Sequence, residues 1–263
     1  MRPIGSGLCV SLFTLSIALP ACSKPPEDPA VLHRALGNDH ARNADWAAAA
    51  QEYALSLQAN PRDSKVWELK ANAHLKLGQV PQAAESLVRR AEYTTTDPNA
   101  KAEAYRLVAG IYVQRQDFAE AEKAFIEASK LDPSDELSLS WLGEFASGRG
   151  GARSMADQPD PVWLSKAIAY YDKVIALNPD NLFAYVNKRI AITKYMVFEE
   201  QEKALADRLI YLERKDAFKM EAAKTRLNES TARLAEFEGE IAKLSKKISE
   251  LVAAQKAQKR GSS

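Results

Sequence analysis

The side chains that most often serve catalysis and metal binding are sparse in this sequence, which holds three histidines and two cysteines. His33, His40 and His74 stand where neighbouring segments carry aromatic residues, and no paired His-Glu motif or cysteine pair accompanies them. The sequence also lacks a serine nucleophile elbow and a glycine-rich dinucleotide fingerprint. We therefore expect no catalytic residue, no metal site and no cofactor, and the chain is predicted not to be an enzyme.

The two cysteines lie near the N-terminus, in a segment typical of an exported chain. Arg2 supplies a positive charge, and residues 8–19 form an apolar run of about a dozen residues, shorter than the roughly 20 that a transmembrane helix needs. The run ends in Leu19-Pro20-Ala21-Cys22, which resembles the lipobox of bacterial lipoproteins. The resemblance implies a signal peptide over residues 1–21 and a fatty-acyl chain such as palmitate at Cys22. The alternative is an ordinary secretory signal in which both cysteines are incidental.

Residues 22–29 are polar and rich in proline, which is typical of a semi-rigid tether. Ser23 beside the cysteine resembles the sorting pattern of lipoproteins that reach the outer membrane. We therefore expect a lipid-anchored protein of a bacterial outer membrane that faces the periplasm, and the alternative is a secreted periplasmic protein. Removal of Cys9 with the signal and acylation of Cys22 would leave no free thiol in that oxidising compartment.

The charges of the chain are balanced, with 36 Lys and Arg against 35 Asp and Glu, for a formal net charge of +1. No overall field is available to attract nucleic acid or an anionic membrane, so electrostatic recognition must be local. We expect proteins as partners and no nucleic acid, with the membrane reached through the lipid anchor.

From residue 30 onward, apolar positions recur with helical spacing and define a repeated unit of about thirty-five residues. In each unit a small residue precedes a bulky one by four positions, which places both on one helix face. These pairs are Ala49 and Tyr53, Ala83 and Leu87, Ala121 and Phe125, and Ala167 and Tyr171. The first helix of each unit also carries a small residue where the helices should cross, at Gly37, Ala71, Ala109 and Gly143.

This pattern resembles the tetratricopeptide repeat, which implies an all-α solenoid of helical hairpins over residues 30–197. Four units are expected at 30–61, 64–98, 102–133 and 136–179, with a partial fifth from Leu182 and an insertion near 148–161 that should project as a loop. Because each hairpin buries its face only against its neighbours, stacking makes a curved surface that binds peptides, helices or domains.

Polar residues on the first helix of each unit are the candidates for partner binding in that groove. Arg34 and Asn38, one turn apart, resemble part of the clamp with which some members of the family hold a C-terminal carboxylate. The alternative is an ordinary solvated groove. The candidate groove residues are Arg34, Asn38, Lys65, Glu68, Asn72 and Arg106.

Residues 198–260 contain no proline and one glycine, and they predict a long C-terminal helix or two helices in succession. Heptads over 220–251 favour a coiled coil whose seam should find another helix, since an apolar stripe of this length is unfavourable in water. That helix would come from a second copy or another protein, or the segment would pack back on its own solenoid. The seam residues are Met220, Leu227, Leu234, Phe237, Ile241, Leu244, Ile248 and Leu251, with Ala223 and Ser230 between them.

Two functions are consistent with these patterns. The first is a non-enzymatic, lipid-anchored periplasmic scaffold or assembly factor that binds proteins through its groove and coiled coil. The second is a structural oligomer or spacer of an envelope machine that assembles through the C-terminal coiled coil.

Overall fold

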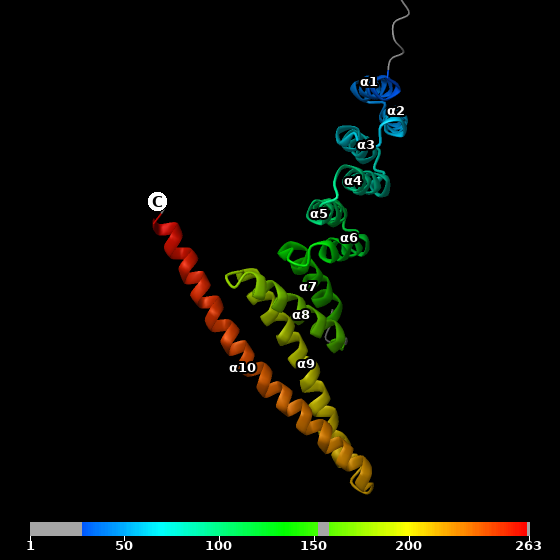
Figure 1. Cartoon of the computed structure of the whole chain (residues 1–263). Coiled ribbons are helices and arrows are strands. Elements are labelled where there is room, and N and C mark those ends of the chain that lie inside the picture. Colours follow the sequence, from blue (N-terminus) through cyan, green and yellow to red (C-terminus); the bar gives the residue numbers. More distant parts are fainter. Residues whose placement is uncertain (1–27, 152–157, 262–263) are drawn as a thin grey trace, which may run out of the picture.

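The computed structural model describes residues 28–151 and 158–261, and this part of the chain is all-helical, as the sequence predicts (Figure 1). Ten helices follow one another: α1 (Pro29–Arg42), α2 (Trp46–Ala59), α3 (Ser64–Lys76), α4 (Val80–Thr94), α5 (Pro98–Gln114), α6 (Phe118–Leu131), α7 (Glu136–Gly150), α8 (Pro161–Leu177), α9 (Leu182–Leu212) and α10 (Ala217–Gly261). None of the helices in these ranges has the length and apolar character required to cross a bilayer. The expected signal peptide, Cys22, and most of the tether lie outside the described residues.

Helix starts are fixed by short polar side chains at the N-cap. An Asp or Asn side chain accepts a hydrogen bond from a backbone N–H of the first turn in every helix from α1 to α9 except α4, which begins after Gln79 and has a proline in its first turn. Such caps satisfy donors that have no partner within the helix. The cap residues are Asp28, Asp45, Asp63, Asp97, Asp117, Asp135, Asp160 and Asn181.

Packing passes from each helix to the next along the chain, and the apolar side chains form consecutive clusters (Figure 1). The four repeat alanines, Ala49, Ala83, Ala121 and Ala167, are all fully buried. Their bulky companions Tyr53, Phe125 and Tyr171 are at most 1% exposed. The predicted solenoid of helical hairpins is confirmed. The small residues let neighbouring helices approach closely, and the large side chains fill the remaining space between them.

The prediction that residues 148–150 belong to a projecting loop is wrong. These residues continue α7, and a side chain at Gly150 would come within 2.8 Å of the Leu164 backbone nitrogen on α8. A glycine is therefore tolerated in this helix because it lets α7 and α8 approach closely. Residues 152–157 lie outside the described part, and Pro161 opens α8.

Of the two alternatives that the sequence leaves open for residues 198–260, the structure has two helices in succession. The fifth unit's first helix runs on without a break to Leu212, and a turn over 213–216 reverses the chain into α10, which packs back along α9 (Figure 1). Glu213 and Asp216 make this turn, since the N–H of Asp216 donates to the Glu213 carbonyl and the Asp216 side chain accepts from the N–H of Lys219. A charged turn without Gly or Pro gives a weak signal in sequence.

The predicted seam does face a helix, and that helix is α9 of the same chain. Leu244 and Leu251 are buried and the other seam residues are half-buried. Phe237 packs edge-on against Tyr195 of α9, with ring centroids 5.0 Å apart. The seam is therefore not a free surface for a second copy, and the alternative in which the segment packs back on its own solenoid is the observed one.

Two charged side chains of α9, which packs against α10, are buried and form ion pairs. Lys188 on α9 is 8% exposed and lies 2.5 Å from the Asp172 carboxylate on α8, and it also pairs with Glu240 on α10. Glu199 is 1% exposed, and its Oε1 lies 2.7 Å from Nε of Arg233. These pairs fix how α10 lies on α9, because a shifted pairing would leave a buried charge without its partner.

Candidate protein-binding pocket

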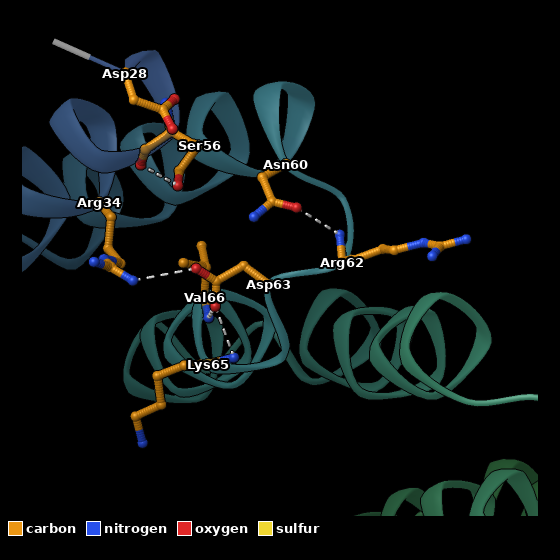
Figure 2. Close-up of polar contacts among 9 residues, drawn as sticks. Asp28, Arg34, Ser56, Asn60, Arg62, Asp63, Lys65 and Val66 are labelled. Carbon is orange, nitrogen blue, oxygen red and sulfur yellow. Dashed lines mark hydrogen bonds and ion pairs between the residues drawn. The ribbon is translucent and has the colours of Figure 1, made fainter.

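Two of the candidate groove residues join successive repeat units. Arg34 Nη1 on α1 donates to Asp63 Oδ2 at 3.3 Å, while Oδ1 of the same carboxylate accepts from the backbone N–H groups of Lys65 and Val66 and so caps α3 (Figure 2). Arg106 repeats the arrangement two units later, because its Nη1 donates at 3.3 Å to Asp135, the cap of α7. Both arginines therefore have partners that hold the stack together.

The equivalent position in the second unit is Glu68, which forms an ion pair of 3.1 Å with Lys65 on the same helix. Both side chains are more than half exposed, so this pair contributes little to stability. Asn72 is exposed and makes no hydrogen bond to another described residue. This stretch of α3 is the solvated part of the predicted groove.

Two packing tyrosines donate a hydrogen bond to the residue that follows a crossing glycine. Tyr53 donates to Asn38 Oδ1 at 2.9 Å, and Tyr171 donates to Glu144 Oε2 at 3.5 Å. Asn38 thus supports the fold of the first unit. Neither Arg34 nor Asn38 is left without a partner, so the resemblance to a carboxylate clamp gains no support from their contacts.

A cavity with a volume of about 640 Å³ lies between α7 and α9. We call it the α7–α9 pocket. Leu137 and Phe183 are each 51% exposed, and Trp141 stacks on Phe125 with ring centroids 5.8 Å apart. The lining residues are Glu136, Leu137, Ser140, Trp141, Glu144, Asn181, Phe183 and Asn187. An apolar surface that is open to solvent and held on rigid helices is suited to bind an apolar side chain.

The pocket is also acidic. Glu136 Oε2 accepts from the side-chain amides of Asn178 and Asn181 at 3.0 and 3.1 Å. Among the described residues, neither Glu136 nor Glu144 has a lysine, arginine or histidine within ion-pair distance. Burial raises the pKa of Tyr171, and the nearby Glu144 carboxylate raises it further, so this hydroxyl stays protonated and donates to Glu144. The two carboxylates are therefore available to a cationic group of a ligand.

The sequence contains a signal for this pocket, although none of its residues was a candidate. Leu137, Ser140 and Glu144 stand at the same offsets from Gly143 as Lys65, Glu68 and Asn72 do from Ala71. The same offsets, extended to the fourth unit, would have found three of the lining residues. Phe183 and Asn187 come from the fifth unit, which the sequence predicts only in part.

The described residues contain no group of three or more His, Cys, Asp or Glu side chains that could hold a metal ion. The three histidines make polar contacts instead of filling aromatic positions in the core. His33 lies 2.7 Å from Glu52, and His74 lies 2.8 Å from Gln79 across the turn between α3 and α4.

Comparison with known proteins agrees with the helical geometry. Models of the tetratricopeptide repeat family match residues 34–101 and 102–135. Residues 34–135 of this chain are tetratricopeptide repeats. Proteins with these repeats are generally scaffolds for protein interactions and are typically not enzymes.

Several known proteins resemble this chain at low sequence identity. The U-box domain-containing protein 70 of Oryza sativa subsp. japonica is 26% identical over 103 residues, which are 39% of this chain and 12% of that protein. A crystal structure of a TPR repeats protein from Bacteroides fragilis NCTC 9343 shares the fold, with a TM-score of 0.56 and 17% identity over 87% of this chain and 98% of that one. The crystal structure of MamA protein covers 80% of this chain and 96% of its own, with a TM-score of 0.41 and 18% identity.

Proposed function

We propose that this protein is a scaffold that binds a protein segment in the α7–α9 pocket, and that the segment presents an apolar side chain next to a lysine or arginine. The observation that carries the proposal is the combination of exposed Leu137 and Phe183 with two carboxylates that have no cation within the described chain. The apolar side chain would cover Phe183 and Trp141, and the cation would pair with Glu144 or Glu136.

Synthetic peptides test this proposal. One set carries leucine or phenylalanine beside lysine or arginine, and the matched set carries glutamate in place of each basic residue. We expect isothermal titration to show binding of the basic set only. Phe183→Ala should weaken this binding roughly tenfold, since it removes a large apolar contact, and Glu144→Gln should weaken it less.

Leu177→Ala is the matched control, because Leu177 is 43% exposed at the end of α8 and does not line the pocket. It should bind the basic peptides as the unmodified protein does. If both peptide sets bound equally, or if Phe183→Ala changed nothing, the pocket would not be the binding site.

We further propose that the scaffold is anchored by a lipid at Cys22 in a bacterial outer membrane and faces the periplasm. The support is the sequence alone: the apolar run over residues 8–19, the order Leu19-Pro20-Ala21-Cys22 and the proline-rich residues that follow. Metabolic labelling with palmitate tests the anchor. We expect incorporation that is lost in Cys22→Ser, and release of an unlabelled protein by a signal peptidase would instead favour the secreted periplasmic form.

A further inference from the structure

α10 takes its packing from a single helix. Among the described residues it lies along α9 and makes no comparable contact with any other helix (Figure 1). The contacts that join the two helices include the rings of Tyr195 and Phe237 and the ion pair of Lys188 with Glu240. Since these contacts need only one α9 and one α10, the α10 of a second copy can make them equally well.

The buried face of α9 and the seam of α10 follow one heptad register. Counting back in sevens from Met220 and Ala223 passes through the turn at Glu213 and Asp216 and then along α9. Every α9 position reached in this way is buried or half-buried, as are Glu213 and Asp216 themselves. These α9 positions are Tyr185, Lys188, Ile192, Tyr195, Glu199, Glu202, Ala206 and Leu209. A single unbroken helix would therefore carry both buried faces on one side.

The backbone of the turn between the two helices is close to helical. The N–H of Glu213 donates to the Leu209 carbonyl at 2.8 Å, and the N–H of Met220 donates to the Asp216 carbonyl at 2.9 Å. Both bonds have the spacing of an α-helix. Each residue of the turn has a negative φ, and none is glycine or proline. The turn can therefore straighten into a helix without a residue that opposes one.

We propose that two copies of this chain exchange α10, with residues 213–216 as the hinge. In this exchanged dimer, α9, the hinge and α10 of each chain form one continuous helix. The two helices run antiparallel, and the α10 of each copy covers the α9 of the other. The contacts between α9 and α10 are all kept, and exchange of an identical element is a low-cost route to a dimer. The two α7–α9 pockets would lie about 95 Å apart, towards opposite ends of the paired helices.

Asp216 favours the closed hairpin over the exchanged dimer. Its side chain caps α10 by accepting a hydrogen bond from the N–H of Lys219 at 3.1 Å, and a continuous helix loses this cap. The hinges of the dimer cross at its two-fold axis, so four carboxylates, from Glu213 and Asp216, meet there with only two Lys219 ammonium groups and repel one another. Arg214 and Lys215 are exposed and lie off the seam. The closed monomer is therefore favoured at low concentration, and the dimer forms when chains refold at high concentration.

Refolding from urea at low and at high protein concentration tests the proposal, with sedimentation equilibrium as the measurement. We expect a monomer at low concentration and a dimer fraction at high concentration. Asp216→Leu should raise the dimerisation constant roughly tenfold or more, since the dimer no longer loses two helix caps. It also leaves two Glu213 carboxylates balanced by two Lys219 side chains at the axis.

Lys215→Leu is the matched control, because it places the same leucine in the same turn but off the seam, and it leaves the Asp216 cap in place. It should not change the dimer fraction. Adding Lys215→Gly to Asp216→Leu should lower the dimerisation constant roughly tenfold, since glycine is unfavourable inside a helix and each dimer holds two. Absence of a dimer in the unmodified protein refolded at high concentration would overturn the proposal, and so would equal dimer fractions in Asp216→Leu and Lys215→Leu.

A crosslink across the hairpin distinguishes exchange from any other dimer. Lys247 Nζ on α10 lies 3.3 Å from Asp180 Oδ1, which directly precedes α9, and a carbodiimide can join the two side chains. Unlabelled and isotopically labelled chains are refolded together before the reaction. In the exchanged dimer, crosslinked peptides should combine Asp180 of a labelled chain with Lys247 of an unlabelled one. Crosslinks confined to single chains within the dimer fraction would overturn the proposal. The hinge and the α7–α9 pocket share no residue, so each proposal can fail without the other.

Discussion

At the scale of single residues, each crossing position is matched to the aromatic or aliphatic group that packs on it. Gly37 faces Tyr53 and Gly143 faces Tyr171, and the equivalent positions of the second unit hold Ala71 and Leu87. A methyl group at Gly37 would stand 2.6 Å from Tyr53 Cε1, a distance that no unstrained contact allows.

We therefore expect Gly37→Ala to lower the free energy of unfolding by about 1–3 kcal/mol through overpacking. Gly110→Ala is the control, because no atom lies within 4 Å of the added methyl group and alanine is favoured over glycine inside a helix by about 1 kcal/mol. Urea denaturation measures both. Combining Gly37→Ala with Tyr53→Leu copies the second unit, and it should recover part of the loss. Equal stability of the two alanine variants would contradict this explanation.

A second residue-scale expectation concerns the turns within units. Ala44 and Gln116 adopt φ values of 59° and 60°, and the equivalent residue of the second unit is Gly78 at 72°. The left-handed region costs a residue with a side chain roughly 1–2 kcal/mol, and glycine escapes this cost although it gains entropy in the unfolded chain.

Ala44→Gly and Gln116→Gly should therefore each raise the free energy of unfolding by about 0.5–1 kcal/mol, and Gly78→Ala should lower it by a similar amount. Thermal unfolding followed by circular dichroism provides the measurement. A lower melting temperature for Ala44→Gly would show that the turn gains nothing from glycine.

At the scale of helices, Lys188 joins α8, α9 and α10. Burial works to lower the pKa of its ammonium group, but hydrogen bonds and charge attraction from Asp172 and Glu240 outweigh it, so the pKa is raised. A raised pKa in the folded state means that the contribution of Lys188 to stability is complete below the ordinary lysine pKa of about 10.4. It is lost as the pH rises through the folded-state value.

We expect Lys188→Met to destabilise the protein by about 1–2 kcal/mol at pH 8, since two half-exposed carboxylates lose a charged partner. The difference between the two proteins should shrink above pH about 10.5. Urea denaturation of both proteins at pH 8 and above pH about 10.5 measures this difference in unfolding free energy. A difference that stayed constant would mean that the packing of the Lys188 side chain matters more than its charge.

Much of the helical architecture is predictable from the sequence because small and large residues recur at fixed offsets, and these determine how hairpins nest. The heptads correctly predict which face of α10 is covered, since every seam residue is buried or half-buried. The identity of the covering helix is not predictable in this way. It depends on the reversal at Glu213 and Asp216, and a four-residue charged turn resembles solvated helix surface.

The pocket was missed for a related reason. The candidate groove residues all have charged or amide side chains, yet the α7–α9 pocket is built from Leu137, Trp141 and Phe183, residues that sequence reasoning assigns to a core. Their exposure arises from the geometry between the fourth and fifth units, which no local pattern records.

At the scale of the whole molecule, the described residues form a solenoid that ends in the α9–α10 hairpin. Because α9 covers the coiled-coil seam, we expect a monomer in sedimentation equilibrium at micromolar concentration. Leu244 is 6% exposed, and Leu244→Ala should lower the free energy of unfolding by about 2–5 kcal/mol without changing the oligomeric state. A dimer that Leu244→Ala converts to a monomer would restore the oligomer hypothesis.

The most direct test of the central claim uses a photo-reactive amino acid placed in turn at 183, 177 and 68, with a labelled peptide that carries phenylalanine between two lysines. We expect crosslinking from position 183 that excess unlabelled peptide suppresses, and little crosslinking from position 177 at the end of α8 or position 68 on α3. Equal crosslinking from all three positions, or crosslinking confined to position 68, would contradict recognition in the α7–α9 pocket.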